Sequence, residues 1–180
     1  MPGNYYLTTD YTVDQPLSTD IGKNISICLN GHTLYASKQA ILVNWESTIT
    51  ICDCSKGKTG SIQGTDANRS DLFLVRRDDD DEDEDSGTLL LNGCKLSGVW
   101  GVENCGGTFE AVNVTAVMER AFLYGDDGYE AKITDSNISS SETAIIVSRN
   151  SLTLRNTVVQ ASEYAIKSIS SDVEIYGGTV

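Results

Sequence analysis

The sequence contains few residues from which a core of large side chains could be built. Aromatic residues make up 7% of the 180 residues, and proline occurs only twice. No stretch approaches the roughly 18 consecutive apolar residues of a membrane-spanning helix, and no basic-then-apolar leader opens the chain. Serine and threonine together number 36, so the composition favours a small-residue interior and a hydroxyl-rich surface, and it predicts no membrane span.

Basic residues are also scarce. There are 13 Lys and Arg residues against 26 Asp and Glu residues, which gives a net charge of −13. Because a phosphate backbone is held by Lys and Arg, we expect no direct binding of nucleic acid. Eight of the acids form the unbroken run Asp78–Asp85, without which the net charge would be −5. Adjacent carboxylates repel one another and resist burial, so we predict a solvated acidic loop inserted at residues 76–87.

Cysteine and histidine are too few for a disulfide scaffold or a common zinc site. The cysteines are odd in number and cannot all pair within the chain: Cys28, Cys52, Cys54, Cys94 and Cys105. Cys52-Asp53-Cys54 has C-x-C spacing, whereas redox and zinc motifs use C-x-x-C, and His32 is the single histidine. We favour reduced, semi-apolar cysteines over a structural disulfide, and we expect no cofactor apart from weak Ca²⁺ binding at the acidic loop.

Internal repetition is the strongest signal in the sequence. The triplets 131–133, 152–154 and 173–175 follow one another at intervals of 21 residues. The same interval separates Ile138, Val159 and Val180, and it separates residues 144–147 from 165–168. Upstream, Leu89–Leu91 precede Phe109–Ala111 by 20 residues, and Ile25–Ile27 precede Ile49–Ile51 by 24. The acidic run lengthens the interval between those two pairs.

Each repeat contains three short segments in which apolar residues alternate with polar ones, as in a strand with one buried side. Gly, Asn, Asp and Ser separate the segments, and Asn92-Gly93, Asp135-Ser136-Asn137 and Gly177-Gly178 suit the positive φ angles of tight corners. Three such strands cannot enclose a core alone, but they can form one coil of a parallel β-helix. Strands of successive coils then pair, and equivalent side chains stack about 4.8 Å apart. We expect Ile133, Leu154 and Ile175 to form one interior column.

The two ends of the chain differ from the repeats. Residues 5–13 contain three of the eight tyrosines and do not match the repeat, so we predict an N-terminal capping segment at 1–22 and coils at 23–180. The sequence stops at Gly177–Val180 in the middle of a coil. We therefore expect either a longer solenoid or a final edge that another chain covers.

Four stretches carry a family resemblance: residues 3–10, 27–34, 48–55 and 60–62. They resemble the opening of right-handed parallel β-helix regions in large surface proteins of Gram-positive, often gut-dwelling, bacteria, and the later repeats resemble the pectate-lyase-like superfamily generically. The resemblance implies a right-handed helix and a cell-surface, adhesive setting, without a catalytic residue. The predicted fold class is thus all-β: a right-handed parallel β-helix (solenoid) of about seven coils, with about 21 residues and three short strands per coil.

Candidate catalytic residues are sparse. His32 falls in the turn Asn30–Thr33, and we interpret it as a turn residue because no serine or cysteine context suggests a triad. Glu142 and Glu163 lie one repeat apart, with Glu119 near the same corner, and stacked carboxylates would approach the separation used by retaining glycosidases. We favour solvated glutamates here and rank a polysaccharide lyase or hydrolase third among the functions.

The first hypothesis is a non-catalytic binding module of a bacterial surface protein, whose stacked strands present Ser, Thr, Asn and aromatic groups to a glycan or a protein. The alternative is a small acidic, intracellular or phage-type inhibitor that occupies a basic nucleic-acid-binding site on a partner protein. The absence of a leader would make that alternative cytoplasmic. Its predicted partner-binding residues are Asp78, Asp79, Asp80, Asp81, Glu82, Asp83, Glu84, Asp85, Asp126 and Asp127.

Overall fold

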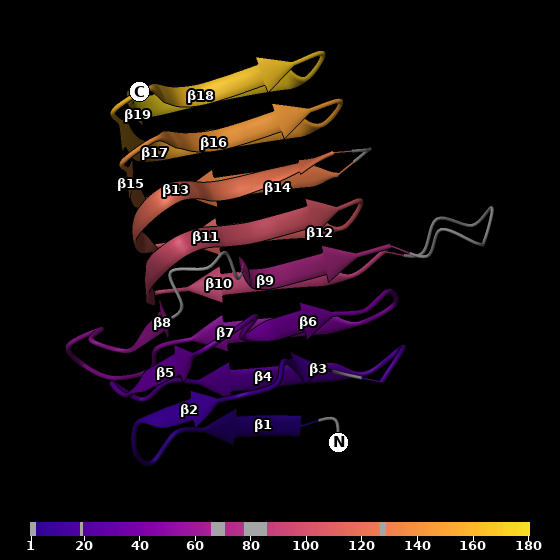
Figure 1. Ribbon diagram of the computed structural model, residues 1–180, viewed down its shortest axis with the longest axis vertical. Helices are drawn as coiled ribbons and strands as arrows, with labels where there is room; N and C mark the ends of the chain where they lie inside the picture. The colour runs from indigo at the N-terminus through magenta and orange to yellow at the C-terminus, as the bar shows by residue number, and fades with distance from the viewer. Residues whose placement is uncertain (1–2, 19, 66–70, 78–85, 127–128) are drawn as a thin grey trace.

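A computed structural model describes residues 3–18, 20–65, 71–77, 86–126 and 129–180. These residues form 19 strands and no helix. Figure 1 shows the strands stacked as coils along one long axis, with the N-terminus at one end and the C-terminus at the other. The described residues therefore include no helix long and apolar enough to cross a membrane.

The strands fall into three series that run along this axis. The first series contains β1 (Gly3–Tyr6), β4 (Asn24–Cys28), β7 (Thr48–Cys52), β10 (Thr88–Asn92), β12 (Thr108–Val112), β14 (Glu130–Thr134), the first part of β17 (Ser151–Ala161) and β19 (Asp172–Thr179). The second contains β2 (Tyr11–Val13), β5 (Thr33–Ala36), β8 (Ser61–Gly64), the first parts of β11 (Lys95–Cys105) and β13 (Thr115–Asp126), β15 (Asn137–Ser140) and the second part of β17. The third contains β3 (Leu17–Ser18), β6 (Ile41–Val43), β9 (Asp71–Arg76), the second parts of β11 and β13, β16 (Thr143–Ser148) and β18 (Tyr164–Ile169).

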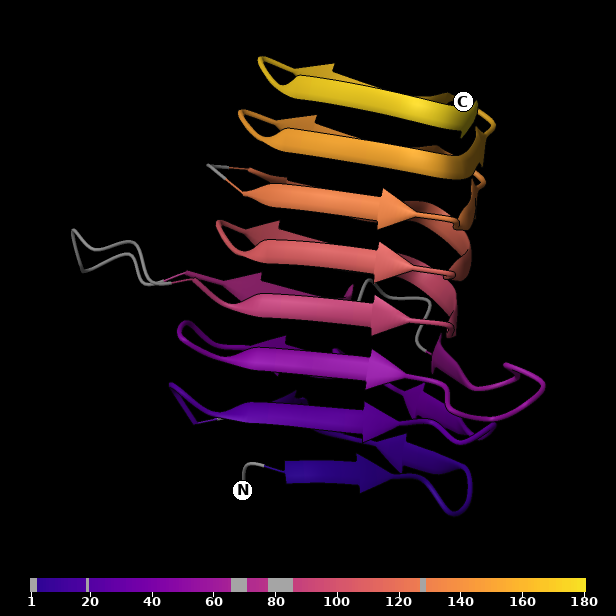
Figure 2. The same ribbon diagram turned by 180° about the vertical axis from the view of Figure 1, so that it is seen from behind.

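All pairings between these strands are parallel, and the predicted fold class is confirmed. In the first series, residues in register are 20 to 24 apart, except that Thr48 is in register with Thr88. That long interval contains the acidic insertion. In Figure 2 the first-series strands run left to right in front and the chain returns behind them while it climbs, which makes the solenoid right-handed.

The core is a set of side-chain columns inside the coils. Ile133 is in register with Leu154, as predicted, and both are fully buried. Ile175 continues this column but is 48% exposed, because it lies in β19, the last strand described. The rings of Phe109 and Phe122 are both fully buried in the interior, with centroids 5.8 Å apart. Small aliphatic residues fill most of the interior, because stacked parallel strands leave a narrow space between the series.

One corner repeats a left-handed backbone conformation. The residue that follows the first-series strand has a positive φ angle in successive coils, between 48° and 66° at Gly93, Asn113, Asp135 and Asn156, and 78° at Gly177. Asn, Asp and Gly are the residue types that tolerate this conformation. The side-chain amide of Asn156 also donates to the Asp135 carboxylate at 3.2 Å. The spacing of these residues thus bends the five coils from β10 to β19 at the same place.

The N-terminal segment pairs as a coil. Tyr5 is in register with Ile27, Tyr11 with Leu34 and Leu17 with Ile41. The expectation that residues 5–13 stand outside the repeat is therefore wrong: residues 3–18 provide one strand to each series. The repeat is hard to see in this sequence because tyrosines occupy positions where later coils have aliphatic residues. Tyr5 and Tyr11 are 45% and 55% exposed, since no coil lies beneath them in the described chain.

Candidate functional site

The predicted acidic partner site is described only at its edges. Asp78–Asp85 and Asp127 lie outside the described residues, whereas the backbone of Asp126 ends β13 and is in register with Ser148. Arg77 and Ser86, on either side of the acidic run, form an antiparallel bridge, so the chain leaves and re-enters the solenoid at one corner. Arg76 is in register with Cys105 on the next coil. Asn104 is in register with Gly125, so Asp126 lies at the position of Cys105 one coil further on. The end of β13 is therefore at the same corner as the insertion, two coils away.

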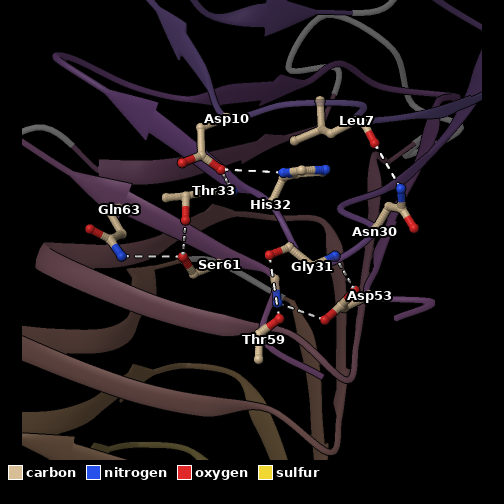
Figure 3. Close-up of polar contacts among 11 residues, drawn as sticks. Leu7, Asp10, Asn30, Gly31, His32, Thr33, Asp53, Thr59, Ser61 and Gln63 are labelled. Carbon is tan, nitrogen blue, oxygen red and sulfur yellow. Dashed lines mark hydrogen bonds and ion pairs between the residues drawn. The ribbon is translucent and has the colours of Figure 1, made fainter. Parts of the chain in front are cut away.

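His32 has a carboxylate partner that sequence reasoning missed. Its Nδ1 lies 3.5 Å from Oδ1 of Asp10, which also accepts a hydrogen bond from the backbone N–H of Thr33 at 2.9 Å (Figure 3). The Thr33 hydroxyl is 3.0 Å from that of Ser61 and does not contact the imidazole. Within the described residues, no hydroxyl or thiol is hydrogen-bonded to His32. The Asp10 carboxylate therefore links the imidazole of His32 and the backbone of Thr33 to the preceding coil.

A buried carboxylate organises the neighbouring corner (Figure 3). Asp53 is 1% exposed and accepts hydrogen bonds from the backbone N–H groups of Gly31, Ser55 and Gly60 at 2.9, 3.0 and 2.6 Å, and from the Ser55 hydroxyl at 2.8 Å. Burial opposes ionisation of this carboxyl, but the hydrogen bonds from Ser55, Gly60 and Gly31 outweigh it and lower its pKa. Its acceptor oxygens are occupied by the protein's own donors, so the role of Asp53 is structural.

The cysteine prediction is corrected at this same corner. Cys28 and Cys54 form a disulfide, with Cα atoms 6.0 Å apart, whereas reduced cysteines were favoured. The pairing was hidden because it joins consecutive coils: Cys28 is in register with Cys52, and Cys54 begins the turn that follows. Burial raises the pKa of the Cys94 thiol to about 12, so this cysteine stays protonated and unreactive near neutral pH.

The two stacked glutamates lie in a cleft on the outside of the third series. The cleft has a volume of about 210 Å³ and is lined by Trp100, Arg120, Ala121, Glu142, Thr143, Ile146, Glu163 and Lys167. Arg120 Nε lies 3.7 Å from Oε1 of Glu142, and the Thr143 hydroxyl lies 3.4 Å from Oε2 of Glu163. The backbone N–H of Glu163 donates to the carbonyl of Glu142 at 3.1 Å, which fixes the two glutamates on consecutive coils.

A bulge places Arg120, one of the two cations of this cleft, over an aromatic ring. Between Gly98 and Trp100 the pairing of β11 with β13 shifts, so that Met118 and Ala121 are their partners and β13 holds one extra residue. The Arg120 guanidinium lies 5.5 Å from the centroid of the Trp100 ring. Bulges re-aim side chains in this way, and the cation–π contact holds the guanidinium at the rim of the cleft.

A second group of polar residues adjoins the cleft. The rings of Trp100 and Tyr124 are in contact, with centroids 4.7 Å apart, and the Tyr124 hydroxyl donates to Oδ1 of Asp71. Glu103 is in register with Tyr124. Burial raises the pKa of Glu103, and so does the nearby Asp71 carboxylate. Burial and the bond to Asp71 likewise raise the pKa of Tyr124. Carboxyl groups and two aromatic rings thus continue the surface of the cleft toward β9.

Sequence reasoning identified Glu142 and Glu163 but missed the rest of this site. Trp100, Arg120, Tyr124 and Lys167 carry no motif, and they meet only through the register of the third series. The available signal was the outward position in that series, where Leu74, Glu103, Tyr124, Ile146 and Lys167 succeed one another in register. Glu119, the third predicted carboxylate, is not among the residues that line the cleft.

Within the part of the chain that the structure describes, no three His, Cys, Asp or Glu side chains are grouped so that they could hold a metal ion. Comparisons of the chain with protein-family models, with curated proteins and with solved structures find no match. The fold itself defines the class: the protein is a parallel β-solenoid.

Proposed function

We propose that this solenoid is a non-catalytic binding module that holds a glycan on the outside of its third series, in the cleft between Trp100 and Lys167. The observation that carries the proposal is that an aromatic ring lies beside side chains that donate hydrogen bonds and side chains that accept them. Trp100 offers an aromatic ring, Arg120 and Lys167 donate, and Glu142 and Glu163 accept. A sugar ring presents apolar C–H groups and hydroxyls that both donate and accept, so it matches this surface.

The size of the cleft supports a single sugar residue as the bound unit. Pockets for drug-sized ligands usually hold about 300–1,000 Å³, and this cleft of about 210 Å³ is smaller. Its lining residue Trp100 also contacts the ring of Tyr124, which is in register with Ile146 of the cleft. A glycan chain lying along the third series would meet the cleft with one sugar and the neighbouring rings with the next.

Binding without turnover is favoured by the contacts of the two glutamates. Glycoside hydrolysis needs one carboxyl group that gives its proton to the leaving oxygen. Here Glu142 faces a guanidinium and Glu163 accepts from a threonine hydroxyl, and both contacts are those of acceptors. The resemblance of residues 3–10, 27–34, 48–55 and 60–62 to bacterial surface β-helices supports a cell-surface, adhesive setting for such a module.

Calorimetric titration with hexasaccharides tests this function. Trp100→Ala should weaken the binding of the preferred glycan about tenfold, because a stacked ring contact contributes about 0.5–1.5 kcal/mol beyond the apolar area that it buries. Trp45→Ala, in the turn after β6, is the matched control and should bind as the parent does. Mass spectrometry of the glycan after long incubation should show no cleavage. Equal affinity in the two variants, or cleavage that Glu142→Gln abolishes, would contradict the proposal.

The acidic corner favours a second candidate, binding of a basic protein through residues 78–85 and Asp126–Asp127. The supporting observation is the register, which brings Arg76, Cys105 and the end of β13 to one corner. Deleting Asp78–Asp85 and joining Arg77 to Ser86 should keep the fold, since these two residues are already bridged. Loss of a salt-sensitive interaction with a basic protein, with glycan binding retained, would support this candidate. If the deletion variant binds basic proteins as the parent does, this second candidate function is wrong.

A further inference from the structure

The charges around the cleft define which glycans it accepts. Arg120, the cation above Trp100, is paired with Glu142 at 3.7 Å, so its charge is already balanced by the protein. Lys167 is the other cation of the cleft, and Glu163 lies in the same lining. The cleft therefore contains two positive and two negative side chains, with no surplus of positive charge for an acidic ligand.

The surroundings add negative charge. Asp71 accepts from the Tyr124 hydroxyl, and burial together with the nearby Asp71 carboxylate raises the pKa of Glu103. Asp71 is in register with Trp100 on the neighbouring coil, where the next sugar of a bound chain would sit. The chain as a whole carries a net charge of −13. A carboxylate or sulfate on the ligand would meet repulsion at this subsite and across the molecule.

We propose that the cleft is specific for uncharged glycans and rejects polyuronates and sulfated chains. This inference rests on the proposed glycan-binding function and narrows its ligand class. Neutral hydroxyls are matched by the acceptors Glu142 and Glu163 and the donors Arg120 and Lys167 without bringing a further charge into the site. The two glutamates act as the selecting residues: Glu142 pairs with Arg120, and Glu163 places a second negative charge in the same lining as Lys167.

The selection is tested by comparing glycans of equal length. The probes are neutral hexasaccharides of glucose, N-acetylglucosamine, xylose and mannose, together with hexagalacturonate and hexaguluronate, titrated at 150 mM NaCl without added divalent ions. At least one neutral hexasaccharide should bind at least ten times more tightly than either uronate. A uronate that binds as tightly as the best neutral sugar, with the binding lost in Trp100→Ala, overturns the specificity and leaves the glycan site standing. Absence of binding by all six probes overturns the glycan site itself.

A double substitution tests the cause of the selection. In Glu142→Gln/Glu163→Gln the cations are no longer offset, so uronate affinity should rise at least tenfold, and 0.5 M NaCl should remove most of that gain. Affinity for the neutral sugar should not rise, because each glutamine loses one of the two acceptor oxygens that the sugar hydroxyls use. The control Glu110→Gln/Glu130→Gln makes the same change in net charge on the first series. Equal gains in the two double variants would overturn the assignment of selectivity to the cleft.

Discussion

Leu154 stacks in register on Ile133 inside the solenoid, and both side chains are fully buried. Leu154→Asp would place a carboxylate in this closed interior without a partner, and it should lower the free energy of unfolding by at least about 4 kcal/mol. The matched control is Ile175→Asp, one coil further along the same column, where the side chain is 48% exposed and the loss should be much smaller. Chemical denaturation measures both, and similar losses would contradict the column.

The Cys28–Cys54 disulfide closes a loop between neighbouring coils. The two cysteines are 26 residues apart, so the chain-entropy model predicts about 3.5 kcal/mol of stabilisation. Reduction, or the substitution Cys54→Ser, should therefore lower the midpoint of thermal unfolding. Cys105→Ser, outside any disulfide, should keep the full response to reductant. A parent protein that melts at the same temperature with and without reductant would show that the crosslink does not stabilise it.

The buried Asp53 makes stability depend on pH in the acid range. Its pKa is lowered in the folded protein, so its stabilising contribution is present above the ordinary aspartate value of about 3.9 and is lost as pH falls through the folded value. Asp53→Asn turns one acceptor oxygen into a donor opposite backbone N–H groups and should cost about 2 kcal/mol at pH 7. The difference from the parent should shrink below pH 4. Asp135→Asn, at an exposed turn, should change stability by less than about 0.5 kcal/mol.

The Glu103 carboxyl gives the opposite pH dependence. Because burial and Asp71 raise its pKa, its contribution to stability is full below the unfolded value of about 4.3 and is lost as pH rises through the raised folded value. Glu103→Gln imitates the protonated side chain. This variant should be more stable than the parent at pH 7, by up to about 1 kcal/mol, and equal to it at pH 4. Denaturation curves at the two pH values decide the point, and a variant that is less stable at pH 7 would contradict the assignment.

The repeat was predictable from the sequence because its signal is distributed. Columns such as Ile133–Leu154 follow from aliphatic residues at fixed spacing, and the corner residues Gly93, Asp135 and Gly177 follow from their tolerance of positive φ angles. Each coil repeats the same pattern, so a residue that departs from it in one coil does not hide the repeat. Residues 5–13 were misjudged because tyrosines replace the aliphatic residues in one coil.

The site could be predicted only in part, because its residues are related through space. Glu142 and Glu163 stand one repeat apart and were found by that spacing. Arg120 reaches Trp100 only because β13 has one extra residue at a bulge, and no residue type in the sequence indicates that shift. The partners Asp10 of His32 and Cys54 of Cys28 were missed for the related reason that each contact joins different coils.

Tryptophan fluorescence gives the most direct test of the proposed glycan site, since the chain has only two tryptophans. In Trp45→Phe the remaining indole, Trp100, lines the cleft, and its emission should shift and saturate as the preferred neutral hexasaccharide is added. In Trp100→Phe the remaining indole, Trp45, lies in the turn after β6, and its emission should not respond. A saturable change in the first variant alone is the predicted result. A silent Trp100 under conditions where calorimetry detects glycan binding would place the ligand elsewhere and contradict the account.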